Sequence, residues 1–165
     1  MIVDLSNLLK AEGSKIRFDS VMKVDELEFN GDRYSFPEPV NVSGNVFNAG
    51  NVLELKAAVS GCIHVKCYRC MRAIQRDFSF AMDETLTNDD ASEAEEAIRF
   101  EGHRIEIDDI VINHILLNTS MKYLCSEDCK GLCSACGADL NEGVCGCKNE
   151  DVDPRLEVLK KLLEE

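Results

Sequence analysis

The sequence predicts an α+β protein: an antiparallel β-sheet with a cysteine hairpin, two helices and a C-terminal zinc-ribbon-like segment. Three observations predict it. Apolar and polar residues alternate strictly over 53–65, helical patterns lie near 108–118 and 154–164, and the nine cysteines fall mostly in tight pairs. Period-two alternation is typical of a half-buried strand, whereas apolar positions three and four apart are typical of a helix.

The first 35 residues carry only a weak pattern. Leu5, Leu8 and Leu9 have helical spacing over a short stretch, and residues 24–29 are compatible with an irregular strand. From Pro39 the alternation improves, and a turn follows over 48–51.

The most regular pattern in the chain predicts a long hairpin. Every second residue is apolar or small in the set Leu53, Leu55, Ala57, Val59, Gly61, Ile63 and Val65. After Cys67-Tyr-Arg-Cys70 the alternation resumes and runs to Met82. Two long strands that flank a short turn predict an antiparallel hairpin with Cys67 and Cys70 at its tip.

An acidic stretch and a helix follow the hairpin. Residues 83–101 hold eight carboxylates against one arginine, Arg99, which predicts a solvated loop. Ile105 and Ile107 favour a short strand, and Asp108 is a suitable N-cap for a helix over 108–118.

The last residues predict a second helix over 154–164. Asp153 is a good N-cap, Pro154 suits the first helical position, and the leucines that follow share one face. We therefore divide the chain into a β-rich α+β domain over 1–124, a cysteine-rich zinc-binding segment over 125–148, and a C-terminal helix over 149–165 that docks on the domain.

Composition limits the possible functions. The chain has 165 residues and a formal net charge of −13, which disfavours a general nucleic-acid coating protein. Its first residues lack the basic region and apolar run of a signal peptide, and no apolar stretch approaches the ~20 residues of a membrane span. We expect a cytoplasmic protein without membrane contact, in which cysteines stay reduced and indicate metal or redox chemistry.

The clearest candidate site is a set of four cysteines. Cys133, Cys136, Cys145 and Cys147 fall within fifteen residues, and the first pair is followed by Gly137. Short C-x-x-C turns direct two thiolates at one ion and are typical of zinc knuckles. The spacing predicts a Zn²⁺ site here, which we call site one.

A second zinc site is predicted by what remains. Cys67 and Cys70 lack two ligands, and so do Cys125 and Cys129, so a site two that joins the pairs would clamp the hairpin tip. A single site drawn from residues 125–147 with other ligands is a competing arrangement, so the chain is expected to hold one or two zinc ions. Cys62 is left over and is interpreted as a small packed residue.

Other chemistry finds less support. A thioredoxin-like use of Cys67 and Cys70 needs the first cysteine at a helix N-terminus, whereas a strand follows here. Catalytic zinc keeps an open position and often uses histidine or carboxylate ligands. We find no catalytic triad, phosphate loop or paired-carboxylate motif, and we expect neither catalytic residues nor a small-molecule substrate.

A basic cluster stands out in the acidic chain. Lys66, Arg69, Arg72 and Arg76 surround Tyr68 at the hairpin tip. Cations with an aromatic side chain are suited to a nucleic-acid backbone and a stacked base. The same cations would equally offset the charge of about −2 that four thiolates and one Zn²⁺ carry, so both interpretations stay open.

These motifs together resemble the YceD family, whose members are called large ribosomal RNA subunit accumulation proteins. The resemblance runs from IVDLSNLL at the start through Cys67-Tyr-Arg-Cys70, CSEDCKGLCSACGADLN and Cys145-Gly-Cys147 to the DPRL of the last helix. It implies a role in ribosome biogenesis and no known catalytic activity. The C-x-R-C element is common to the family, whereas the cluster over 133–147 occurs only in some members.

We therefore expect a non-enzymatic factor that promotes accumulation of large-subunit ribosomal RNA. It would bind precursor ribosomal RNA or a ribosomal protein, with Lys66, Tyr68, Arg69, Arg72 and Arg76 as the RNA contact. One alternative is an acidic zinc-containing adaptor that binds a basic ribosomal protein without touching RNA. Another is a thiol redox sensor with a reversible Cys67–Cys70 disulfide.

Overall fold

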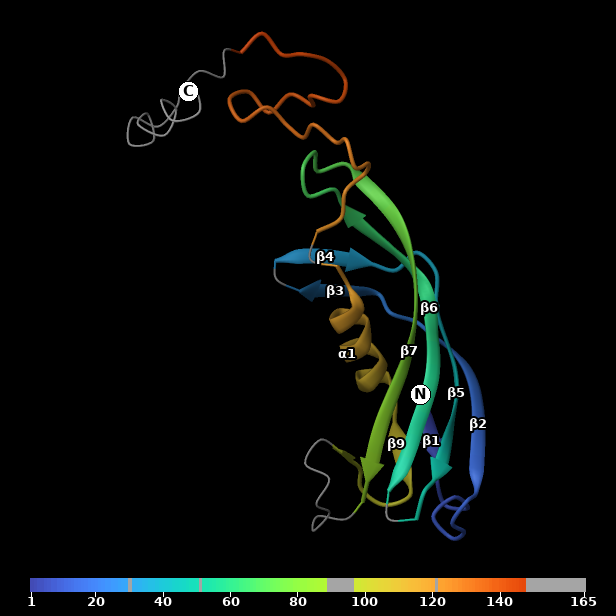
Figure 1. The fold of residues 1–165 in the computed structure, drawn as a ribbon. Helices are drawn as coiled ribbons and strands as arrows, with labels where there is room; N and C mark the ends of the chain where they lie inside the picture. Colours follow the sequence, from blue (N-terminus) through green and yellow to red (C-terminus); the bar gives the residue numbers. More distant parts are fainter. Residues whose placement is uncertain (30, 51, 89–96, 121, 148–165) are drawn as a thin grey trace, which may run out of the picture. The chain divides into compact units, whose positions relative to one another are not determined.

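The computed structural model describes residues 1–29, 31–50, 52–88, 97–120 and 122–147 (Figure 1). Two compact units make up the chain. We call Met1–Lys66 with Ala73–Tyr123 the β unit, and Cys67–Arg72 with the residues from Leu124 onward the cysteine unit. Each is described by itself.

The described residues form nine strands and one helix, all in the β unit. In chain order these are β1 (Ile2–Asp4), β2 (Lys15–Met22), β3 (Glu26–Phe29), β4 (Asp32–Ser35), β5 (Val40–Asn48), β6 (Leu53–Lys66), β7 (Ala73–Thr87), β8 (Ile98–Arg99), β9 (Arg104–Glu106) and α1 (Asp108–Asn118). β1 and β9 form a two-stranded sheet, and the others form a seven-stranded sheet in which β6 pairs with β4, β5 and β7.

The predicted hairpin is confirmed. β6 and β7 pair antiparallel without interruption from Leu53↔Leu86 to Lys66↔Ala73, and both are drawn as long arrows in Figure 1. This ladder leaves residues 67–72 as the connection between the two strands. The alternation in the sequence specified it because a shift of one residue would move every apolar side chain to the opposite face.

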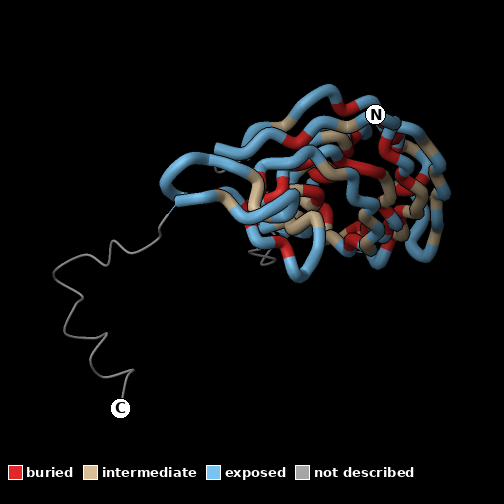
Figure 2. Tube along the Cα trace, turned by 90° about the horizontal axis from the view of Figure 1, so that it is seen from above, coloured by how far each residue is buried: buried red, intermediate tan, exposed pale blue. Residues whose placement is uncertain are grey.

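The core of the β unit is aliphatic. Leu55, Val59 and Val42 have no exposed surface, and along β6 most buried residues alternate with less buried ones. Figure 2 shows buried segments of the trace enclosed by exposed ones. Cys62 is buried on β6, where it pairs in register with Asp77 of β7. Burial raises the pKa of its thiol. It belongs to neither cysteine group described below.

Helix α1 packs on the sheet through Ile110, Val111 and Ile115, which join the same hydrophobic core. Its bounds match the prediction, but its N-cap does not: Ile107 is the N-cap and makes no side-chain capping bond, and Asp108 lies in the first turn. On the helix, His114 stacks on Phe80 of β7 and hydrogen-bonds to the Glu84 carboxylate at 2.6 Å.

The predicted α+β class with two helices is wrong, because the protein is mostly β and the described residues hold one helix. The weak pattern near the N-terminus did not predict β1, β2 and β4, whereas β3 lies within the irregular strand expected over 24–29. Leu5 and Leu8 are buried, but they lie in turns after β1. β2 is exposed at every second residue and only partly buried at most of the others, so its apolar alternation is diluted by polar residues.

The acidic loop begins later than predicted, because β7 continues to Thr87 and buries Leu86 and Thr87. The predicted helix over 154–164, and with it the docking of residues 149–165, lies outside the described residues. Within the described part of the chain, no helix has the length and apolar character that crossing a membrane requires.

Candidate metal centres

The four cysteines of the predicted site two lie close together in the cysteine unit. We call them the first group, or first centre, because Cys67 comes first in the chain. The turn after β6 supplies Cys67 and Cys70, and the segment after Tyr123 supplies Cys125 and Cys129. The Sγ atoms of Cys67 and Cys129 are 3.8 Å apart, and those of Cys70 and Cys125 are 3.6 Å apart. A regular tetrahedron with Zn–S bonds of about 2.3 Å separates its sulfurs by about 3.8 Å. The spacing therefore fits one tetrahedral ion.

The turn that carries the first pair is a tight knuckle. The N–H of Met71 donates to the Cys67 carbonyl at 2.9 Å, and the N–H of Cys67 donates to the Arg72 carbonyl at 2.8 Å. Met71 takes the left-handed backbone conformation, with φ 59°, and its side chain is 55% exposed. A side chain at such an angle is strained by roughly 1 kcal/mol relative to glycine.

We expect Met71→Gly to stabilise the cysteine unit by about 1 kcal/mol without changing its metal content, because glycine adopts this angle without strain. Thermal or denaturant unfolding of the metal-loaded chain, monitored in the cysteine unit, measures the difference. Gly137→Met is the matched control and should destabilise by a similar amount, because Gly137 takes φ 75° at the equivalent position. Destabilisation by Met71→Gly would show that the methionine makes a compensating contact.

The cysteines of the predicted site one form the second group, or second centre, and repeat the turn geometry of the first. Cys133, Cys136, Cys145 and Cys147 place their Sγ atoms within 4.8 Å of one another. The N–H of Gly137 donates to the Cys133 carbonyl at 2.9 Å, as Met71 does in the first turn. Cys133 is buried, whereas Cys136 and Cys147 are exposed. The two groups therefore share a local geometry and differ in their access to solvent.

Backbone N–H groups lower the pKa of one cysteine thiol in each group. Burial alone would raise the pKa of Cys67, but N–H groups of Cys70, Cys125 and Arg69 outweigh it and lower the pKa to about 6. The amides of Cys136 and Ala135 lower the pKa of Cys133 to about 6.

The pKa values of Cys70 and Cys147 shift in the opposite direction. The N–H of Arg72 lowers the pKa of Cys70, yet burial and the neighbouring sulfurs outweigh it and raise the pKa to about 12. The sulfur of Cys136, with its charge, raises the pKa of Cys147 to about 12. A bound metal ion would favour the thiolate form of all four cysteines in a group and release their protons.

The structure brings together the four cysteines of each predicted set, and either group could hold a metal ion. Four thiolates at tetrahedral spacing leave no open position for a substrate, which is typical of structural rather than catalytic sites.

The predicted nucleic-acid residues are placed in different ways. The guanidinium of Arg69 donates to the carbonyls of Glu127 and Cys129, at 3.2 and 2.8 Å. Lys66 and Arg76 are exposed residues of the β unit, and Arg76 donates to the carbonyl of Gln75. Tyr68, in the cysteine unit, is 58% exposed.

Arg72 forms ion pairs with two carboxylates within the cysteine unit. Its Nη2 is 3.2 Å from Asp139 and 3.4 Å from Glu142. The nearby Asp139 carboxylate raises the pKa of Arg72. Of the two interpretations of the basic cluster, the contacts of Arg69 and Arg72 fit the one in which cations support the cysteine groups.

Sequence reasoning missed Asp139, Asn141 and Glu142. The N–H of Asn141 donates to Asp139 Oδ1 at 2.9 Å, and the amide of Asn141 donates to the same oxygen at 2.6 Å. An Asp-x-Asn sequence between two cysteine pairs is typical of such a local turn and was the available signal. Their contacts with the first cysteine group depend on the fold and leave no local signature.

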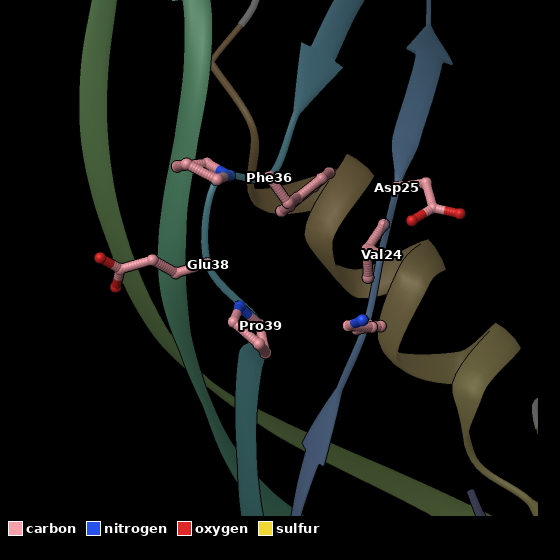
Figure 3. A pocket seen from close by; sticks show the side chains of 7 residues that line it. Val24, Asp25, Phe36, Glu38 and Pro39 are labelled. Atoms are coloured by element: carbon pink, nitrogen blue, oxygen red, sulfur yellow. The ribbon is translucent and has the colours of Figure 1, made fainter.

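The β unit offers a pocket of little chemical consequence. Figure 3 shows it between Val24, Phe36 and Pro39, with the Asp25 and Glu38 carboxylates turned away from its centre. Its volume is about 100 Å³, below the ~300 Å³ at which ordinary small-molecule sites begin. This pocket therefore gives no support for a small-molecule site.

The fold and the site define a class: a mostly β protein with a separate unit built around two four-cysteine groups. The sequence model of the family described as "Large ribosomal RNA subunit accumulation protein YceD" matches residues 55–163. The chain belongs to this family, as its motifs predicted. The match includes β6 from Leu55 onward, β7, α1 and both cysteine groups.

Curated relatives cover a shorter part of the chain. Uncharacterized proteins of Mycobacterium bovis and Mycobacterium tuberculosis are 27% identical to it over 103 residues, which is 59% of this chain and 49% of theirs. The chain thus spans about half the length of the curated relatives it matches. No solved structure matches it significantly.

Proposed function

We propose that this protein is a non-enzymatic, zinc-containing factor that promotes accumulation of large-subunit ribosomal RNA by binding its precursor. The family supports the ribosomal role. The observation that supports zinc is the pair of four-thiolate groups with sulfurs 3.6 to 3.8 Å apart in the first of them. Zn²⁺ is the common ion in closed tetrahedral sites with four cysteines.

The zinc ions would act on the structure of the cysteine unit. Cys67 and Cys70 would bind one ion together with Cys125 and Cys129, which lie more than fifty residues later in the chain. Such a cross-link holds the turn 67–72 and the segment after Tyr123 in one geometry. The proposed RNA contact uses Tyr68 and the basic residues that lie near it in the sequence, in a chain that we expect to be cytoplasmic.

Binding to precursor RNA as a function of salt tests this contact. We expect Lys66→Glu with Arg76→Glu to weaken binding and to lower the salt slope by about one for each phosphate that the variant no longer neutralises. Both residues lie in the β unit, outside the cysteine groups, so the zinc content should not change. Lys15→Glu with Arg17→Glu on β2 changes the net charge equally and is the matched control.

Equal effects of the two double variants would contradict a contact at the hairpin tip. Zinc-loaded protein that binds no precursor RNA would favour the adaptor that engages a basic ribosomal protein. The net charge of −13 supports that second candidate, because two zinc ions bound by eight thiolates would make the chain more negative still.

The redox sensor makes a distinct prediction. It requires a Cys67–Cys70 disulfide, in which these two thiols would no longer serve as zinc ligands. A reversible disulfide in protein that lacks stoichiometric zinc would replace the metal proposal.

A further inference from the structure

Asn141 connects the two cysteine groups, because it lies in the loop of the second group and contacts a cysteine of the first. Asn141 lies in the loop between Cys136 and Cys145, so the second group fixes both ends of its segment. Its amide nitrogen lies 3.5 Å from the Sγ of Cys129, a member of the first group. Its Oδ1 accepts the N–H of Lys130, next to Cys129, at 2.8 Å. A loop closed by the second group therefore supplies an N–H···S contact to the first.

A second connection runs in the opposite direction. Arg72 ends the turn that carries Cys67 and Cys70, and its guanidinium reaches Asp139 and Glu142 in the loop of the second group. Arg72 thus lies between the thiolates of one group and the carboxylates that the other group's loop positions. It is a cation shared by the two groups.

The backbone adds a third connection. The N–H of Leu132 donates to the Arg69 carbonyl at 3.2 Å, and the N–H of Leu140 donates to the Gly131 carbonyl at 2.9 Å. Gly131 has φ +77°, and a Cβ there would lie 3.1 Å from the Arg69 carbonyl oxygen. Backbone hydrogen bonds therefore connect the first turn to the segment before Cys133, and that segment to the loop after Cys136.

We propose that the two centres bind metal cooperatively, with Asn141 and Arg72 as the positioning residues that couple them. This inference rests on the zinc content proposed above. An ion at the second centre would order the loop that carries Asn141 and Asp139. The first centre would then bind its ion with these supporting groups already in place. The ordering cost is met once for both ions, and the coupling is reciprocal by linkage.

The size of the effect follows from the contacts. One hydrogen bond to a charged group is worth about 1.5–3 kcal/mol, so its loss lowers affinity by roughly 10- to 150-fold. Exposure of Asn141 and Arg72 to solvent places the expected coupling near the lower limit, about tenfold.

The first experiment removes the second centre from the full-length chain. In Cys133→Ser with Cys136→Ser, we expect the affinity of the first centre for Zn²⁺, measured by competition with a chromogenic chelator, to fall about tenfold. Reciprocally, Cys67→Ser with Cys70→Ser should weaken the second centre by the same factor. Affinities that change less than twofold in both directions would overturn the coupling.

The second experiment keeps all eight ligands. In Asn141→Ala we expect weaker Zn²⁺ binding at the first centre, although the substituted residue lies in the loop of the second. With ¹¹³Cd²⁺ in place of zinc, the resonance of the first centre should shift because Cys129 loses its N–H donor. Asp128→Asn, an exposed neighbour in the same unit, is the matched control. Arg72→Lys, which keeps the charge, should retain more of the coupling than Arg72→Ala.

Combining the variants completes the test. If Asn141 couples the centres, Asn141→Ala should add little to the double cysteine variant of the second centre, because the loop is then already unsupported. Full additivity would overturn the proposal. A chain that binds two zinc ions independently refutes the coupling alone, whereas a chain that binds none refutes the zinc proposal as well.

Discussion

Removal of zinc is expected to unfold the cysteine unit while the β unit stays folded. The buried cluster of the described cysteine unit consists of Cys67, Cys70 and Cys129, with Leu124 and Cys125 packed against it. A segment of this size without an aliphatic core needs metal or disulfides to hold its structure. The free energy of metal binding is then the free energy of folding for this unit.

Native mass spectrometry should give two zinc ions per chain in protein purified without chelator. After chelation, hydrogen exchange should accelerate in residues 67–72 and 124–147, while the amides of β6 and β7 keep their protection. Cys129→Ser should reproduce the loss at the first centre, and Cys62→Ser is the matched control because Cys62 lies outside both groups. Unchanged protection of the cysteine unit after complete zinc removal would contradict a metal-dependent fold.

The second large effect concerns the sheet. We expect Val59→Ala on β6 to lower the free energy of unfolding of the β unit by about 2 kcal/mol, because it removes two buried methyl groups and leaves a cavity. Val59 has no exposed surface and lies in the central strand between β5 and β7. Urea or thermal unfolding of the zinc-loaded chain measures the change.

Val21→Ala is the matched control for this prediction. The same atoms are removed, but Val21 lies on β2 and is 62% exposed, so its loss should change stability by less than about 0.5 kcal/mol. Zinc content should be unchanged in both variants. Equal losses in the two would mean that burial on β6 does not set the stability of the sheet.

The parts of the fold that the sequence predicted are those in which burial is one-sided and regular. Along β6 the residues Leu53, Leu55 and Val59 alternate with less buried neighbours, and this pattern alone specified a strand and its hairpin. β2 and β3 lie far from the centre of the sheet and bury less of each side chain, so their sequences carry little alternation. That difference explains why the sequence showed only a weak pattern over the first 35 residues.

The sequence by itself determined the four cysteines of site one, because C-x-x-C and C-x-C spacings impose local geometry on their thiolates. For the other four cysteines it left a competing arrangement open, because Cys67 and Cys70 are distant in sequence from Cys125 and Cys129. It also determined the family, through motifs spread along the chain. Only the tertiary structure decided that Cys67 lies beside Cys129 and that Arg69, Arg72 and Asn141 support the cysteine groups. These are contacts between residues that are distant in sequence, and no local propensity or periodicity encodes such a pairing.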